Sequence, residues 1–214
     1  MPDPAISKRP IILGASSLWE EAPALFASSG IIAYPTETFY GLCVNPFDRV
    51  AIKKLFALKG RPPEKPITLI VRDREMLDRV ASGITPLAER LMERFWPGPL
   101  TIIFNARADV PAELTGGTGT LGVRVSASPV ATRLSALLDS PITATSANPT
   151  DKDAPTDPQD VVGYFDGEID MLIDGGRLAG KKGSTIVDAR GGSLVIFREG
   201  EIPVESLMDV VIRD

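Results

Sequence analysis

The sequence predicts an α/β or α+β fold in which helices pack on a mixed β-sheet. Two observations support this prediction: short β-rich runs alternate with helical stretches, and some neighbouring runs have no helix between them. The expected strands are short, apolar and flanked by Gly, Pro, Asp or Asn, and they cover residues 11–13, 31–34, 67–71, 100–104, 121–125, 142–145, 171–173, 185–187 and 194–197. Because the last three strands follow one another directly, we expect a mixed sheet rather than a purely parallel one.

The expected helices begin and end at recognisable residues. Asp48 is a suitable N-cap and Gly60 a typical stop for a helix that has Lys53 and Lys54 on its outer face. Three further helices open with a capping residue followed by proline, at Thr85-Pro86, Ser128-Pro129 and Asp157-Pro158.

The start of the first helix has two interpretations. Ser17 and Glu20 fit a capping box, which places the start directly after Ser17. Pro23 would then remove a hydrogen bond from the helix, which favours a start nearer Glu21. Both interpretations place the helix before the strand expected at 31–34.

The composition excludes several classes of protein and site. With 214 residues, 43% of them hydrophobic, the chain is long enough for one domain with a buried core. No apolar run approaches the roughly 20 residues that cross a bilayer, and the first ten residues do not resemble a signal peptide, so we expect a cytoplasmic protein. The absence of histidine excludes Ser-His-Asp and Cys-His catalysis. The single cysteine, Cys43, cannot form an intrachain disulfide or a zinc site, and a buried thiol is its favoured interpretation.

The net charge of −5 is unevenly distributed. Residues 49–79 contain nine Lys or Arg and four Asp or Glu, a local balance of +5, so the rest of the chain carries −10. An acidic protein with one basic segment is not typical of a general nucleic-acid binder. The segment indicates either a localised anion site or a solvated basic helix face, and composition alone favours the second. Any metal would be a hard ion held by oxygen atoms and brought by a phosphate substrate.

A cluster of cations surrounds the end of the helix that stops at Gly60. Lys59, Arg61 and Lys65 lie within seven residues, and neighbouring prolines restrict the backbone. Binding a triphosphate requires several cations in fixed places, with Arg as a planar fork and Lys as a point charge. The helix dipole would explain Lys59 but not the other two cations. The sequence therefore favours an anion site here.

Two polar turns follow expected strands. Residues 34–42 suit a small polar ligand, although an ordinary turn explains them equally well. In residues 143–149, local backbone hydrogen bonds are the favoured interpretation of Ser146 and Asn148.

Residues 175–182 nearly match a P-loop, but Lys182 replaces the hydroxyl residue and a strand, not a helix, is expected next. We therefore expect no P-loop.

Taken together, these segments resemble the YrdC-type threonylcarbamoyl-AMP synthase family. The resemblance rests on short motifs in the family's order, from about residue 16 to 205: PTETFYGL at 35–42, KGR at 59–61, FWPGPLT at 95–101, GVRV at 122–125, SAN at 146–148, IDGG at 173–176, STIVD at 184–188 and REG at 198–200. Each motif is weak alone, but the ordered set is specific. It implies a single domain, residues 1–214, with a YrdC-like twisted mixed sheet and flanking helices around a concave basic cavity.

The resemblance implies an enzyme that uses ATP together with Mg2+. L-threonine and bicarbonate would form an N-carboxylate, which would attack the α-phosphorus of ATP and release pyrophosphate. The product, threonylcarbamoyl-AMP, would serve a separate transferase complex acting on tRNAs that read ANN codons, and a weak contact with tRNA itself is left open. Two alternatives remain: a tRNA- or double-stranded-RNA-binding module without catalysis, and a carbamoyl-AMP-forming domain of the carbamoyltransferase type.

The resemblance also assigns roles to individual residues. Lys59 would stabilise carboxylate or phosphate charge and, with Arg61, would be catalytic. The expected contacts to threonine are Thr38, Arg124, Ser146 and Ser184. The expected contacts to ATP are Arg61, Lys65, Thr120, Asn148, Thr156 and Arg198. No protein ligand to a metal is predicted.

This chain departs from the family pattern at two places. Residues 126–128, Ser-Ala-Ser, stand where the family usually has a proline just after the Arg-Val element. The loop at 177–183 is unusually basic, with Arg177, Lys181 and Lys182. Both departures leave the main motifs intact and affect the expected rim of the cavity.

Overall fold

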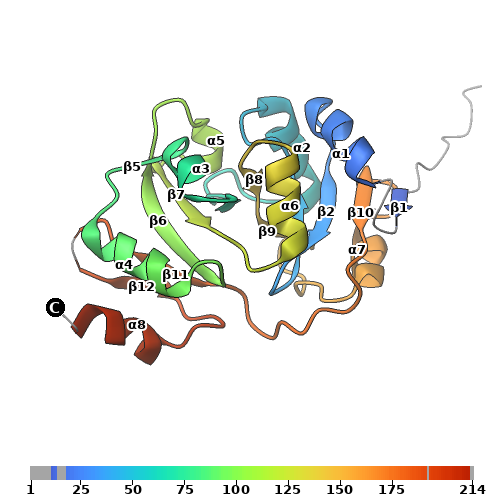
Figure 1. Cartoon of the computed structure of the whole chain (residues 1–214). Helices are drawn as coiled ribbons and strands as arrows, with labels where there is room; N and C mark the ends of the chain where they lie inside the picture. The colour runs from blue at the N-terminus through green and yellow to red at the C-terminus, as the bar shows by residue number, and fades with distance from the viewer. Residues whose placement is uncertain (1–10, 14–17, 192, 213–214) are drawn as a thin grey trace, which may run out of the picture.

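The strands form two hydrogen-bonded sheets, in a computed structural model that describes residues 11–13, 18–191 and 193–212 (Figure 1). The first sheet contains β1 (Ile11–Leu13), β10 (Met171–Ile173), β2 (Ile32–Pro35), β3 (Tyr40–Cys43) and β9 (Thr145–Ser146), in that spatial order. The second contains β12 (Val195–Arg198), β11 (Thr185–Asp188), β6 (Leu100–Ala106), β7 (Thr120–Arg124), β4 (Leu69–Ile70) and β8 (Ile142–Thr143), in that order, with β5 (Ala81–Ser82) paired to β6.

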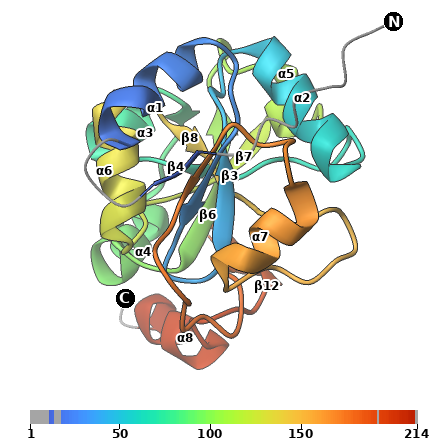
Figure 2. The ribbon, with the colours of Figure 1, turned by 90° about the vertical axis from the view of Figure 1, so that its right-hand side faces the viewer.

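Helices cover the sheets on both sides. They are α1 (Leu18–Ala27), α2 (Arg49–Lys59), α3 (Arg74–Asp78), α4 (Pro86–Phe95), α5 (Ala112–Thr115), α6 (Pro129–Leu137), α7 (Pro158–Phe165) and α8 (Val204–Ile212). Figure 2 shows α1, α4 and α6 on one side of the strands and α2 and α7 on the other. Within the described part of the chain, no helix has the length and apolar character needed to cross a bilayer.

Both sheets are mixed, which confirms the predicted fold class. β10 pairs in parallel with β1 and β2, whereas β3 is antiparallel to both of its neighbours. In the second sheet, β11 is parallel to β6 and antiparallel to β12. The strand expected at 142–145 is divided: β8 pairs in the second sheet and β9 in the first, and between them the Ala144 N–H donates to the Thr68 carbonyl oxygen (2.8 Å). The chain therefore crosses from one sheet to the other at residues 142–146.

Most of the predicted helix signals are confirmed. The Asp48 carboxylate accepts from the Val50 N–H (2.8 Å), and Gly60 has φ 56°, a left-handed conformation that suits glycine. The three predicted caps followed by proline begin α4, α6 and α7. The start near Glu21 was wrong, because α1 begins at Leu18 and contains Pro23. Packing of α1 against β2 and α6 outweighs the hydrogen bond that proline cannot make. Ser17 lies outside the described residues.

The core is apolar and continuous around the second sheet, with a smaller cluster beneath α1 and α6. Cys43 is buried there, as predicted, and burial raises the pKa of its thiol far above the ordinary value. A thiol with so high a pKa is not a nucleophile at neutral pH. The segment that resembled a P-loop is followed by the strand β11, as predicted, and not by a helix.

Candidate active site

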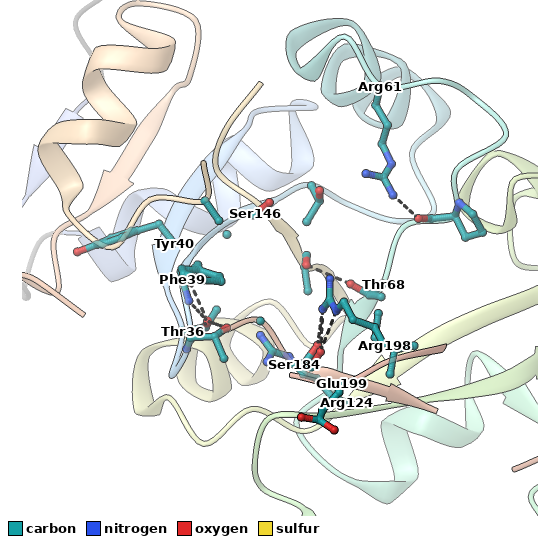
Figure 3. A pocket seen from close by; sticks show the side chains of 18 residues that line it. Thr36, Phe39, Tyr40, Arg61, Thr68, Arg124, Ser146, Ser184, Arg198 and Glu199 are labelled. Carbon is teal, nitrogen blue, oxygen red and sulfur yellow. Dashed lines mark hydrogen bonds between the residues drawn. The ribbon is translucent and has the colours of Figure 1, made fainter. Parts of the chain in front are cut away.

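A cavity of about 330 Å³ lies between the two sheets, beside the crossing at residues 142–146 (Figure 3). Its walls come from the turn between β2 and β3, the end of β7, the β8–β9 segment, and β11 with β12. Six of the predicted site residues line it: Thr38, Arg61, Arg124, Ser146, Ser184 and Arg198. They come from segments up to 160 positions apart, which only the folded chain brings together.

Arg61 reaches the cavity from the residue after the Gly60 cap of α2 (Figure 3). Its Nε donates to the Lys65 carbonyl oxygen (3.2 Å) and its Nη2 to the Pro66 carbonyl oxygen (2.6 Å). These bonds hold the guanidinium without neutralising its charge, and among the described residues no carboxylate pairs with it. Burial lowers the pKa of Arg61, although an arginine stays charged at neutral pH. This cation is held in place and has its charge available for an anion.

Arg198 lines the cavity at the end of β12, next to Ser184. Its Nη2 donates to the Ser184 carbonyl oxygen (2.8 Å), and within the described ranges it has no carboxylate partner either. Burial and then the nearby charge of Arg124 lower the pKa of Arg198. Among the described residues Arg124 is paired with Glu37 whereas Arg198 has no carboxylate, so the charge of Arg198 is available for a phosphate or carboxylate ligand.

Lys59 does not line the cavity but lies behind it, in the last turn of α2. Lys59 is 3% exposed, and its ammonium donates to the carbonyl oxygens of Ser146 and Asn148, each at 2.5 Å. Lys59 thus holds the turn at residues 146–148, which places the Ser146 hydroxyl at the cavity. Burial and then the charge of Arg61 lower the pKa of Lys59 to about 7.

This pKa predicts a pH-dependent stability. The unfolded lysine, with an ordinary pKa of 10.5, binds a proton more tightly than the folded one, so the unfolding free energy should rise from pH 7 towards pH 10. Between pH 7 and 9, the wild type should gain about 2 kcal/mol relative to Lys59→Met in urea unfolding. The exposed Lys53→Met variant is the control. A constant difference between wild type and Lys59→Met would mean that burial does not depress this pKa.

The other predicted contacts lie outside the cavity wall. Lys65 is exposed and its carbonyl oxygen binds Arg61. The Thr120 hydroxyl is hydrogen-bonded to that of Thr118 (2.9 Å), and the Thr156 carbonyl oxygen accepts from the Leu178 N–H (2.8 Å). Contacts of these residues with a ligand stay predictions.

Asn148 is buried and fixed by its own turn. Its Nδ2 donates to the carbonyl oxygens of Pro149 (3.0 Å) and Lys152 (2.6 Å). Among the described residues, its Oδ1 has no hydrogen-bond partner. A buried acceptor without a donor is unfavourable, and a ligand donor would satisfy it.

The structure also adds residues that the sequence analysis did not single out. Tyr40 lines the cavity, and its hydroxyl accepts from the Gly175 N–H (3.0 Å) and donates to the Gly176 carbonyl oxygen (2.8 Å), which ties the residues directly before the basic 177–183 loop to β3. A Cβ at Gly180 would collide with the carbonyl of Thr38, so this loop packs directly on the cavity turn. The only sequence signal for this contact was the glycine itself.

The site can bind an anionic ligand through fixed guanidinium groups and hydroxyls. It offers no histidine base and no thiolate, so the reaction that suits it is one in which a substrate supplies its own anionic nucleophile. Electrostatic stabilisation and positioning are what these side chains supply.

Comparison with known proteins identifies the family of this chain. Residues 24–200 match the Sua5_yciO_yrdC family, whose description is "Telomere recombination". The chain belongs to the Sua5/YciO/YrdC family. It is 36% identical over 173 residues to a threonylcarbamoyl-AMP synthase of Halorhodospira halophila, covering 80% of this chain and 90% of that protein.

Longer members of the Sua5/YciO/YrdC family are similar over part of their length. A threonylcarbamoyl-AMP synthase of Pyrococcus abyssi is 39% identical over 181 residues, which is 85% of this chain and 53% of that relative. The crystal structure of P. abyssi Sua5 complexed with L-threonine superposes with a TM-score of 0.89 at 35% identity, covering 95% of this chain and 60% of that one. The chain thus spans little more than half the length of these relatives.

Proposed function

We propose that this chain is a threonylcarbamoyl-AMP synthase, a nucleotidyltransferase that uses L-threonine, bicarbonate and ATP. The threonine amine and bicarbonate give an N-carboxylate and water. A carboxylate oxygen then bonds to the α-phosphorus of ATP as the bond to pyrophosphate breaks. The product serves a transferase complex that modifies tRNAs reading ANN codons.

One observation carries the proposal. Two guanidinium groups that have no carboxylate partner among the described residues lie around the same cavity as the 146–148 turn. Arg61 and Arg198 have no carboxylate partner among the described residues, and both line the space that Ser146 faces. An anionic carboxylate that approaches a polyphosphate needs cations to reduce the repulsion. The relatives that share this fold carry the name of the same activity.

The proposed residue roles are those that the family resemblance implies, and six of the residues concerned line the cavity. Arg61 and Arg198 contact the phosphates, and Arg124 contacts the threonine carboxylate. Lys59 acts from behind the wall by holding the 146–148 turn. The remaining proposed contacts to threonine are Thr38, Ser146 and Ser184, and those to ATP are Lys65, Thr120, Asn148 and Thr156.

Magnesium belongs to the proposal only as a companion of ATP. In the ranges that the structure describes, no three His, Cys, Asp or Glu side chains are grouped so that they could hold a metal ion. Bound to the triphosphate, Mg2+ would neutralise phosphate charge. The protein's own contribution is the guanidinium groups and hydroxyls.

The test is pyrophosphate release by the purified chain. Release is expected only when L-threonine, bicarbonate and ATP are all present, and omission of bicarbonate should reduce it to background because no nucleophile forms. Carbamoyl phosphate in place of threonine and bicarbonate distinguishes the carbamoyltransferase alternative. Salt-dependent tRNA binding without any pyrophosphate release would contradict the proposal in favour of an RNA-binding module.

A further inference from the structure

We propose that Glu37, held by Ser126, is a positioning residue that fixes the Arg124 guanidinium for the carboxylate of the amino-acid substrate. The inference rests on the proposed function, in which Arg124 contacts L-threonine. Neither Glu37 nor Ser126 lines the cavity. Both act through Arg124, which does.

The ion pair between Arg124 and Glu37 is the most buried one in the described part of the chain. Arg124 Nη1 lies 2.7 Å from Glu37 Oε1, and the two side chains are 6% and 16% exposed. Arg124 ends β7, whereas Glu37 lies in the turn between β2 and β3. The pair therefore joins the two sheets at the cavity. A buried arginine beside another cation needs such a partner to stay in one orientation.

Ser126 holds the other oxygen of the same carboxylate. Its hydroxyl donates to Glu37 Oε2 and accepts from the Ser128 N–H (3.1 Å). The Ser128 hydroxyl in turn donates to the Pro35 carbonyl oxygen (2.8 Å). Both Glu37 oxygens are thus engaged, one by the guanidinium and one by the serine, so the carboxylate cannot rotate freely.

The backbone on either side of Glu37 is also fixed. The Thr36 Oγ1 accepts from the N–H groups of Thr38 (3.1 Å) and Phe39 (3.3 Å). This turn presents Thr38 to the cavity, while Glu37 faces Arg124. Thr36 and Phe39 of the turn and Arg124 are shown in Figure 3. The geometry of one short turn therefore sets both a cavity hydroxyl and the partner of a cavity cation.

Charge explains why this arrangement positions a ligand rather than only stabilising the fold. An arginine has five N–H donors, and one bond to Glu37 leaves others for a second carboxylate. Because Glu37 neutralises Arg124, the ligand carboxylate is bound by the directed hydrogen bonds of the guanidinium and not by a net positive charge.

The experiment is calorimetric binding of L-threonine and, separately, of ATP to Glu37→Gln and Ser126→Ala. The dissociation constant for L-threonine is expected to rise about tenfold in Glu37→Gln, which removes the ion pair with Arg124, and roughly threefold in Ser126→Ala, which removes one hydrogen bond to the carboxylate. The constant for ATP should stay within about twofold of the wild type. Circular dichroism and thermal unfolding verify the fold of each variant.

Two comparisons separate positioning from a general structural effect. In an Arg124→Ala background, Glu37→Gln should cause no further loss of threonine affinity, because its action passes through the missing guanidinium. Glu89→Gln, which alters an exposed ion pair with Arg74, is the matched control. Equal losses for threonine and ATP, or additive losses in the double variant, would overturn the inference. If the wild type releases pyrophosphate but both variants bind L-threonine as tightly as the wild type, the inference about Glu37 is wrong and the proposed function stands.

Discussion

Replacing Arg61 by alanine is expected to lower threonine-dependent pyrophosphate release by about 100-fold or more, with the fold retained. Arg61 is partly exposed at the cavity, and its two hydrogen bonds go to the carbonyls of residues 65 and 66, which remain solvent-accessible in the variant. The loss should therefore fall on catalysis and ATP affinity rather than on stability. Initial rates and thermal unfolding, measured on the same preparation, check both expectations.

Arg49 provides the matched control for this prediction. It begins the same helix that Arg61 follows, but it is exposed and pairs with Glu113 (3.3 Å) away from the cavity. Arg49→Ala should leave the rate close to that of the wild type. Arg61→Lys should recover only part of the activity, since a lysine retains the charge without the planar fork. Wild-type activity in Arg61→Ala would remove this arginine from the site.

Lys59→Ala is expected to lose most of the activity and also roughly 2–4 kcal/mol of unfolding free energy. The reason is the position of the ammonium, which satisfies the carbonyl oxygens of Ser146 and Asn148 in the interior. Without it, two acceptors lose their donor, and the turn that places Ser146 at the cavity loses its support. Urea unfolding and pyrophosphate release measure the two losses.

The combination of losses distinguishes two roles for Lys59. A positioning role predicts that stability and activity fall together, and that the apparent KM rises for L-threonine and for ATP. Lost activity with unchanged stability would instead indicate that the ammonium leaves the turn and contacts the substrate charge directly. The exposed Lys53→Ala variant, on the outer face of the same helix, should change neither quantity.

Local capping chemistry made the helices predictable from the sequence. A cap such as Asp48, or Ser128 followed by proline, depends only on the next three residues, so the signal is local. β3 was missed because its four residues include Gly41 and Cys43 and directly follow a polar turn. The helices α3 and α5 have five and four residues, too few to show a helical period.

Long-range contacts were not predictable in the same way. The division of the 142–145 strand between two sheets depends on pairing with β3 and β4, which lie far away in sequence. The resemblance identified Arg124, but its partner Glu37 is 87 positions earlier and no spacing rule connects them. The orientation of Lys59 towards the backbone, rather than the cavity, likewise depends on tertiary packing.

We propose that Arg61, Arg198 and the 146–148 turn form one nucleotide site, with Arg124 on its threonine side. A crystal structure of the chain with L-threonine and a non-hydrolysable ATP analogue tests it most directly. We predict the triphosphate against Arg61 and Arg198, and the threonine carboxylate against Arg124. An analogue bound on any other surface, with the cavity between the two sheets left to solvent, would contradict the account.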